Sequence, residues 1–232
     1  FIIASNRDED FFRLSKIPGR HWKNQKYILG GLDKKAGGTW CAINNSGVIG
    51  CIHNRNFKRK NFRLKKTRGE IILKILKGKS AVESINIFKK INMSFYDGFN
   101  LIIADKNNAY WIKYYKSNKN SKINKIPEGI SVITDNDLNS KRDLKINYYK
   151  KLFESTKVPE PDKNLWKDWE SLLSSSKIDR QKNKNQAICF NLNNQFGTVS
   201  STIISISSKN NYIYRYTEKS PKNCKFKKIN LI

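Results

Sequence analysis

The spacing of hydrophobic residues changes several times along this chain, and that change limits the folds it can adopt. Short runs rich in β-branched and aromatic residues, such as 39–43 and 99–104, alternate with stretches such as 68–92 and 164–175, in which apolar residues recur every three to four positions. The first pattern predicts strands and the second predicts amphipathic helices. The order is strands, a helix pair, strands, a second helix pair and strands. It suits antiparallel sheets covered by helices better than alternating βαβ units, and it predicts an α+β fold.

Turn-forming residues set the boundaries of several predicted elements. Asn44-Asn45-Ser46-Gly47 separates two strand-like runs and so predicts a β-hairpin. A break near Gly78 divides the first helical stretch in two, and the proline-containing segment 158–161 precedes the last helix. The predicted strands cover residues 1–4, 39–43, 48–52, 99–104, 109–115, 129–134, 186–192, 199–207 and 211–217, and the predicted helices lie within 68–92, 141–154 and 164–175.

The length of 232 residues fits one large domain or two small ones. No period of 20–50 residues repeats and no linker rich in Pro, Gly or Ser divides the chain, which favours a single domain over residues 1–232. The longest apolar runs are far shorter than the ~20 residues that cross a bilayer, so no membrane span is expected. Four cysteines without CxxC spacing indicate neither a zinc site nor a disulfide scaffold, and they favour a reducing, cytoplasmic location.

The chain is strongly basic, with 46 Lys and Arg against 19 Asp and Glu and a formal net charge of +27. Such a charge attracts polyanions and anionic membranes. However, Lys outnumbers Arg 36 to 10, and the lysines are scattered rather than gathered in one stripe. Arginine is the residue that reads phosphates and bases with a bidentate fork. The charge therefore fits compositional drift better than a nucleic-acid partner, and nucleic-acid binding is kept only as a secondary alternative.

Several kinds of catalytic site are disfavoured by the residues present. His21 and His53 are the only histidines, which excludes a His-rich metal site. A triad with His53 is possible by count, but the chain has no GxSxG elbow. The glycine pairs at 30–31 and 37–38 lack the residues that complete a phosphate-binding loop. We therefore expect neither a metal nor a cofactor.

Polar residues gather where predicted strands end. Taken singly, each group has a structural explanation, because Asn and Asp form caps and turns, Arg68 and Glu70 could pair, and Gly197 could relieve crowding at the start of a strand. Taken together, they indicate a functional site more strongly. The groups are residues 6–9, 54–55, 68–70, 134–136 and 196–201.

The segment Ala4-Ser5-Asn6-Arg7-Asp8-Glu9 resembles the signature of the NRDE family, which includes transport and Golgi organisation protein 2 and many bacterial relatives. Five further blocks resemble the family in order and approximate spacing, so the resemblance covers nearly the whole chain. The segments 21–22 and 198–201 resemble the bacterial branch in particular. The further blocks are residues 30–33, 36–40, 68–70, 98–101 and 196–201.

The resemblance implies a fold similar to the N-terminal nucleophile hydrolases, with two antiparallel sheets packed between helices in four αββα layers. It also implies a Met-Cys start, in which the exposed cysteine thiolate attacks an amide carbonyl. The α-amino group of the same residue, with a pKa of about 8, can take the proton. The sequence begins at Phe1, so we expect the N-terminal part of the domain to be missing and the chain as numbered to be inactive. Cys41, Cys51 and Cys189 are expected to be buried, inert thiols.

The resemblance also implies roles for individual residues. Asp8 best fits the acid that orients the amine, and Asn6 lies two residues earlier on the same face of an extended segment. Arg7 would point to the other face, where Glu9 or Glu70 could pair with it. Asn54 ends a predicted strand, as an oxyanion-hole asparagine does in the related bile-salt hydrolases, and Thr134, with Asp135 or Asn136, occupies a similar strand end. The predicted catalytic residues are therefore Asn6, Asp8, Asn54 and Thr134, and the predicted substrate-binding residues are Arg7, Asn136 and Ser200.

Three functions follow from these expectations. The first is cleavage of a small linear or cyclic amide in a cleft lined by Asn6, Asp8, Asn54 and Thr134, once the N-terminal cysteine is present. The second is a non-catalytic carrier or trafficking protein on the same fold that binds haem or a lipid. The third is a basic nucleic-acid binder.

Overall fold

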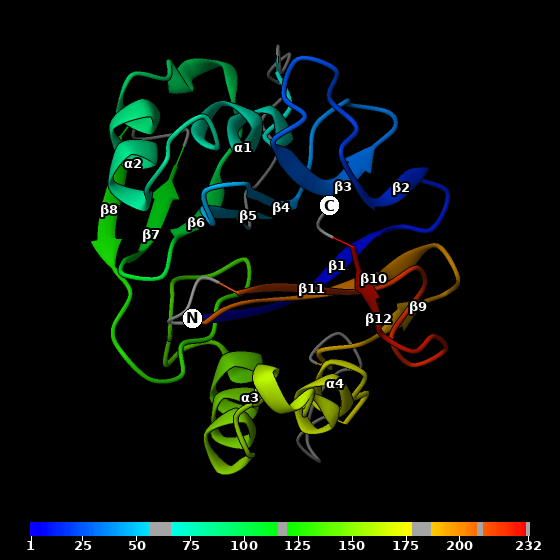
Figure 1. Cartoon of the computed structure of the whole chain (residues 1–232). Coiled ribbons are helices and arrows are strands. Elements are labelled where there is room, and N and C mark those ends of the chain that lie inside the picture. Colours follow the sequence, from blue (N-terminus) through cyan, green and yellow to red (C-terminus); the bar gives the residue numbers. More distant parts are fainter. Residues whose placement is uncertain (56–65, 116–119, 178–186, 208–210, 231–232) are drawn as a thin grey trace. The chain divides into compact units, whose positions relative to one another are not determined.

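The computed structural model describes residues 1–55, 66–115, 120–177, 187–207 and 211–230 (Figure 1). It divides into two compact units. Unit 1 comprises Phe1–Arg13, Glu128–Ile133 and Asn139–Ile232, and unit 2 comprises Leu14–Pro127 and Thr134–Leu138. The described residues form two antiparallel sheets and four α-helices, one sheet and two helices in each unit, which confirms the predicted α+β class.

The sheet of unit 1 is built around the first strand and the last part of the chain. The strand order is β1-β10-β11-β12, and the short β9 pairs with one end of β10. Residues about 200 positions apart are thus neighbours, as Ile2 and Ser205 show. The strands are β1 (Ile2–Asp10), β9 (Asn191–Leu192), β10 (Phe196–Ile206), β11 (Tyr212–Thr217) and β12 (Lys227–Ile229).

Two helices pack on one face of this sheet, α3 (Leu144–Ser155) and α4 (Lys167–Leu173) (Figure 1). The Asp143 side chain caps α3 by accepting a hydrogen bond from the backbone N–H of Ile146 at 3.1 Å. The apolar stripe that predicted the helices forms their contact with the sheet, because Tyr149, Phe153 and Trp169 cluster with Ile203 of β10. Burying such side chains is the main source of stability for an amphipathic helix.

The sheet of unit 2 contains seven strands in chain order, β2-β3-β4-β5-β6-β7-β8, all antiparallel. The predicted hairpin is confirmed, and its turn uses Gly47 with a φ of 79°, a backbone region that favours glycine. The strands are β2 (Ser15–Gly19), β3 (Ile28–Asp33), β4 (Cys41–Asn44), β5 (Ile49–Asn54), β6 (Phe99–Ala104), β7 (Ala109–Tyr114) and β8 (Ser121–Lys125).

The predicted helix pair of unit 2 is also confirmed, as α1 (Gly69–Ile75) and α2 (Ala81–Lys89), with the break at Gly78. Ser80 caps α2 by accepting from the backbone N–H of Glu83 at 3.1 Å. The apolar faces of both helices join one core with the inward residues of the central strands. That core includes Ile71, Ile72, Ile75, Ile85, Phe88, Leu101, Ile103 and Ile112.

Several predicted boundaries were wrong. Residues 129–134 form no strand, because their backbone bonds to a turn: Asn139 donates its N–H to the Val132 carbonyl, and its side chain accepts from the Val132 N–H, both at 2.9 Å. Of the predicted strand 186–192, only β9 is a strand, and Gln186 lies outside the described residues. The strands β2, β3, β8 and β12 were not predicted. Three of them carry lysine at exposed positions, so their sequences lack the alternation that marks a half-buried strand.

Candidate active site

The family-like signature lies on β1, and alternation along the strand separates its residues into two faces. Asn6 pairs with Ser201 of β10 and Arg7 pairs with Ser200, so these two pairs point to opposite faces. The register shifts between Arg7 and Asp8, and the next partner of β1 is Thr198 rather than Val199. This β-bulge places a hydroxyl opposite both Asn6 and Asp8. The prediction that Asn6 and Asp8 share a face, with Arg7 on the other, is confirmed by this register.

The Asp8 carboxylate is held by Thr198. The Thr198 hydroxyl donates to Oδ1 of Asp8 at 2.7 Å, and Thr198 is completely buried. The same hydroxyl oxygen accepts from the backbone N–H of Phe190 at 3.3 Å. One hydrogen-bond chain therefore runs from a fixed backbone amide through the hydroxyl to the carboxylate.

The Asn6 side chain ties β1 to two distant backbone segments. Its Nδ2 donates to the carbonyl oxygens of Leu173 at 2.9 Å and Ile188 at 2.8 Å. Its Oδ1 accepts from the Ser201 hydroxyl at 2.5 Å. Both amide hydrogens and the amide oxygen are thus engaged within unit 1. This arrangement fixes the strand on which Asp8 lies.

Arg7 and Ser200 lie on the other face of the same two strands. Arg7 is 8% exposed, and its Nη2 lies 3.7 Å from Oε2 of Glu9, so Glu9 is one of its partners, as one predicted alternative proposed. The other alternative, Glu70, belongs to unit 2 and contacts Lys74 at 2.7 Å. Burial raises the pKa of Tyr216 on β11, against the lowering effects of the Ser200 hydroxyl and the Arg7 charge.

Three predicted site residues belong to unit 2. Asn54 is the exposed last residue of β5. Thr134 and Asn136 lie in an irregular segment, where the Thr134 hydroxyl accepts from the backbone N–H of Asn136 at 3.2 Å. Asn100 of β6 holds this segment, because its Nδ2 donates to the carbonyl oxygens of Thr134 at 2.9 Å and Asn136 at 2.8 Å. The structure thus brings Thr134 and Asn136 together around a residue that was not predicted to belong to a site.

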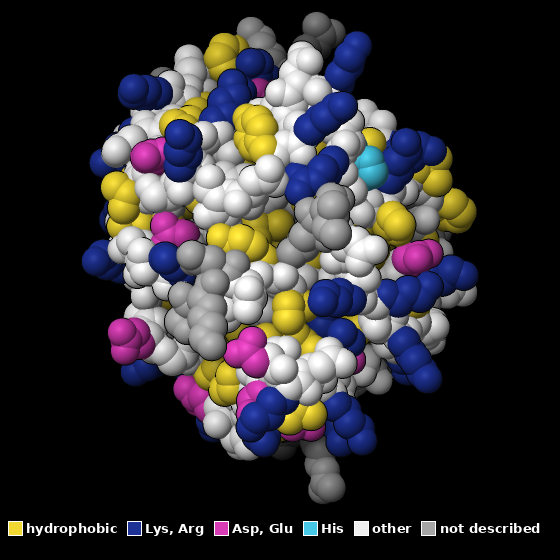
Figure 2. All heavy atoms as spheres, in the orientation of Figure 1, with side chains coloured by type: hydrophobic (Ala, Val, Ile, Leu, Met, Phe, Trp, Pro, Cys, Tyr) yellow, Lys and Arg dark blue, Asp and Glu magenta, His cyan; other side chains and the backbone are white. Residues whose placement is uncertain are grey.

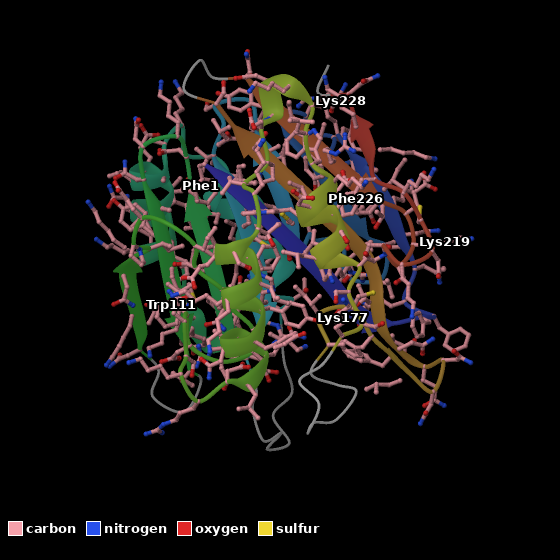
Figure 3. The ribbon with its side chains drawn as sticks, turned by 90° about the horizontal axis from the view of Figure 1, so that it is seen from below. Phe1, Trp111, Lys177, Lys219, Phe226 and Lys228 are labelled. Carbon is pink, nitrogen blue, oxygen red and sulfur yellow. The ribbon has the colours of Figure 1, made fainter. Side chains whose placement is uncertain are left out.

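A charged cluster surrounds Asn100. Arg55, which is 7% exposed, donates from Nη1 to Oδ1 of Asn100 at 2.5 Å and contacts Asp137 from Nη2 at 2.5 Å. Lys113 contacts the second oxygen of Asp137 at 2.5 Å, and Trp111 (labelled in Figure 3) donates from its indole N–H to Asn100 at 3.0 Å. Burial favours a higher pKa for Asp137, but the hydrogen bonds from Lys113 and Arg55 outweigh it and hold the pKa below its usual value.

One signal in the sequence could have revealed this cluster. Asn100 interrupts an otherwise apolar predicted strand, and a polar residue at an inward position needs partners. Asn100 is completely buried. The charged partners could not be found in this way, because Arg55, Lys113 and Asp137 are ordinary surface residue types in a lysine-rich chain.

Comparison with known proteins shows the family to which the chain belongs. A family model described as Transport and Golgi organisation 2 matches residues 1–222. The chain belongs to this family. A mouse protein described as a Transport and Golgi organization 2 homolog is 38% identical over 109 residues, which are 45% of this chain and 38% of the mouse protein. The match therefore spans less than half the length of that relative.

Two solved structures are similar at low identity. One is an N-acylethanolamine-hydrolyzing acid amidase ortholog from Caenorhabditis elegans, with a TM-score of 0.50 and 14% identity over 88% of this chain and 91% of that chain. The other is a penicillin V acylase from Agrobacterium tumefaciens, with a TM-score of 0.49 and 11% identity over 94% of this chain and 78% of that chain. The nematode structure supports the fold, which is that of the N-terminal nucleophile hydrolases, as the family resemblance implied.

The cysteines of this family member are buried or partly buried, as expected for three of them. Cys41 and Cys51 face each other across β4 and β5. A hydrogen bond with Cys51, together with burial, raises the pKa of Cys41 well above its usual value, which makes its thiolate scarce. Cys189 is buried as predicted, although it lies outside any strand.

Other candidate sites gain little from the structure. Among the described residues, no group of three or more His, Cys, Asp or Glu side chains could hold a metal ion, and no helix is long and apolar enough to cross a bilayer. A hollow of about 460 Å³ between α2 and β8 includes none of the predicted site residues. Figure 2 shows Lys and Arg side chains spread over the visible face rather than gathered in one stripe.

Proposed function

We propose that this chain is the hydrolase-fold domain of an enzyme that cleaves the C–N bond of a small-molecule amide. The observation that carries the proposal is the fixed Asp8 carboxylate at the end of the family signature, held by Thr198 at 2.7 Å. The nematode structure of similar fold bears the name of an amide-hydrolysing enzyme, which supports the same reaction class. Because all four cysteines of the chain are free thiols, we also place the protein in a reducing, cytoplasmic compartment.

In the proposed reaction, the nucleophile is the thiolate of the N-terminal cysteine that the family resemblance implies. Its sulfur attacks the amide carbonyl carbon while its α-amino group holds the thiol proton. The tetrahedral intermediate collapses, the C–N bond breaks, and the departing amine takes that proton. Water then attacks the thioester carbon, the amino group accepts the water proton, and the acid leaves as the sulfur is freed. Asp8 accepts a hydrogen bond from the α-amino group and so orients it.

The remaining predicted residues take supporting roles in this proposal. Asn6 has a structural role, because its side-chain amide is hydrogen-bonded to Leu173, Ile188 and Ser201. These bonds hold β1, the strand that carries Asp8. Asn54 and Thr134 stay predicted oxyanion donors. Arg7, Asn136 and Ser200 stay predicted substrate contacts. For each of these five residues, the role beyond the observed contacts comes from the family resemblance.

The test begins with the coding region upstream of Phe1. The longest natural form is purified and assayed for amine release from N-acylethanolamides, penicillin V and conjugated bile acids. We expect release of the amine, and its loss in the N-terminal Cys→Ala variant. A natural form whose mature N-terminus is not Cys, Ser or Thr would overturn the proposal. Retention of haem or lipid without cleavage of any amide would favour the carrier alternative instead.

A further inference from the structure

The Thr198 hydroxyl has a defined direction, because its neighbours fix where its hydrogen points. The oxygen already accepts from the Phe190 N–H at 3.3 Å, so its own hydrogen is available to an acceptor. Two acceptors lie near it, Oδ1 of Asp8 at 2.7 Å and the Ile188 carbonyl at 3.5 Å. The shorter bond to a carboxylate is also the stronger one. The hydroxyl therefore donates to Asp8.

The backbone around Thr198 is built to bring these groups together. The register of β1 and β10 skips Val199, which turns Thr198 to the face that carries Asp8. A Cβ atom on the preceding residue, Gly197, would lie 2.4 Å from the Phe190 carbonyl oxygen, so glycine is needed for the close approach of that segment. The Thr198 N–H also donates to the Phe190 carbonyl at 2.9 Å. Gly197, Thr198 and the bulged residue Val199 thus act together to bring the Thr198 hydroxyl to Asp8.

We propose that Thr198 is a positioning residue that orients the Asp8 carboxylate and favours its ionised form. This inference rests on the proposed function, in which Asp8 orients the nucleophile's amine. A hydrogen bond donated to the charged form of an acid lowers its pKa. An oriented, ionised carboxylate is what an amine at this position needs. The Thr198 hydroxyl thereby acts on the reaction through Asp8 and touches no substrate.

Charged groups on β1 and on the elements packed against its sheet have partners of their own. On β1, the next residue is Glu9, which contacts Arg7 and Arg13 at 3.7 and 3.5 Å. On the same face of the sheet, Arg215 of β11 is paired with Glu170 of α4 at 2.6 Å. Lys145 of α3 places its Nζ 5.1 Å from the centroid of the Phe190 ring. None of these charges is changed by a substitution at Thr198, so a shift seen there reports the hydroxyl.

The test measures the titration of Asp8 itself by carboxyl carbon NMR, with the resonance assigned from Asp8→Asn. We expect Thr198→Val, and Thr198→Ala if the valine variant does not fold, to move the Asp8 midpoint upward. Thr198→Ser keeps the hydroxyl and should restore the wild-type midpoint. Thr202→Val is the matched control, because Thr202 is a buried threonine on the opposite face of β10 and pairs with Ser5. It should leave Asp8 unchanged.

The outcomes separate this inference from the proposed function. An Asp8 midpoint that stays at the wild-type value in Thr198→Val and Thr198→Ala overturns the role of Thr198, whatever the amidase assay gives. If the natural N-terminal form cleaves amides, the acidic limb of its kcat/KM profile should shift upward in Thr198→Val and return in Thr198→Ser. An upward shift of the NMR midpoint without any amide cleavage would support the Thr198–Asp8 coupling while the proposed function fails.

Discussion

Asp8 in unit 1 and Asp137 in unit 2 each belong to a hydrogen-bond network built around an asparagine. The two networks differ in the groups that donate to the aspartate carboxylate. In each network, an asparagine donates both amide hydrogens to two backbone carbonyls: Asn6 to Leu173 and Ile188, and Asn100 to Thr134 and Asn136. Asp8 accepts from the neutral hydroxyl of Thr198. Asp137 accepts from two cations, Arg55 and Lys113.

The difference separates a structural carboxylate from one suited to chemistry. Two cations neutralise the charge of Asp137 and fix it as part of a scaffold around Arg55, which needs a counter-ion because it is buried. The hydrogen bond observed on Asp8 comes from the hydroxyl of Thr198 on the neighbouring strand, which sets the direction of the carboxylate. Asp8 also belongs to the family signature, whereas Asp137 does not. We therefore propose Asp8, rather than Asp137, as the acid of the site.

The largest expected effect is on activity, from Asp8→Asn. The amide oxygen of asparagine can still accept from Thr198, so folding should be kept, with a change of less than about 1 kcal/mol in the free energy of unfolding. The charge that orients the amine is lost, and kcat/KM for amide cleavage by the natural N-terminal form should fall by at least about 100-fold. Steady-state kinetics and urea unfolding measure the two effects. An unchanged rate would remove Asp8 from the mechanism, and Asp137→Asn is the control that should keep the rate.

The next effect is on stability, from Asn100→Ala. Asn100 is completely buried, and its loss leaves two backbone carbonyls and the Trp111 indole N–H without this partner and removes one hydrogen bond of Arg55. We expect a cost of about 3 kcal/mol in the free energy of unfolding. Asn6→Ala removes the corresponding hydrogen bonds to two backbone carbonyls, but at a partly buried position, and should cost about 1–2 kcal/mol in the free energy of unfolding. Urea unfolding decides the order, with Asn107→Ala in an exposed turn as the control. A larger loss from Asn6 than from Asn100 would contradict the comparison.

The sequence revealed the elements of both units more fully than their polar networks. Apolar spacing predicted the two helix pairs and the central strands, because burial imposes a period on the residues it uses. The polar strands β2, β8 and β12 gave no such signal, since exposed lysines do not alternate with apolar residues. Pairing of β1 with β10 requires contacts across most of the chain, which no local pattern encodes.

The candidate site was predicted in part for a related reason. The face shared by Asn6 and Asp8 follows from strand alternation and was predictable, whereas the bulge that brings Thr198 opposite Asp8 was not. The role of an asparagine is also hidden in this chain, which has 28 of them. Asn44, like Asn6 and Asn100, donates both amide hydrogens to backbone carbonyls, those of Leu76 at 2.9 Å and Gly78 at 2.8 Å. The residue type alone does not show whether an asparagine joins backbone segments by hydrogen bonds or belongs to a functional site.

A smaller effect is expected from the pH dependence of Asp137. Its folded-state pKa lies below the usual value of about 3.9, so its stabilising contribution is fully present above that value and is lost as the pH falls through the lowered pKa. The side chain is 40% exposed, and solvent screening limits the contribution to about 1 kcal/mol or less. Asp137→Asn should therefore be less stable than wild type near neutral pH and equal to it in strong acid. Urea unfolding across this range measures the difference, with the exposed Asp162→Asn as the control. A difference that grows on acidification would contradict the assignment.

A double-mutant cycle tests whether the two networks act separately. Ser201→Ala removes the donor to Oδ1 of Asn6 and should cost about 1 kcal/mol in the free energy of unfolding. Combined with Asn6→Ala it should cost less than the sum of the two, because both substitutions remove the same bond, with a coupling of about 1 kcal/mol. Combined with Asn100→Ala it should be additive within about 0.5 kcal/mol, since the observed hydrogen bonds of the two networks share no partner. If Ser201 were coupled to Asn100 as strongly as to Asn6, the networks of Asp8 and Asp137 would be one cooperative network. The contrast between the two aspartates would then lose its physical basis.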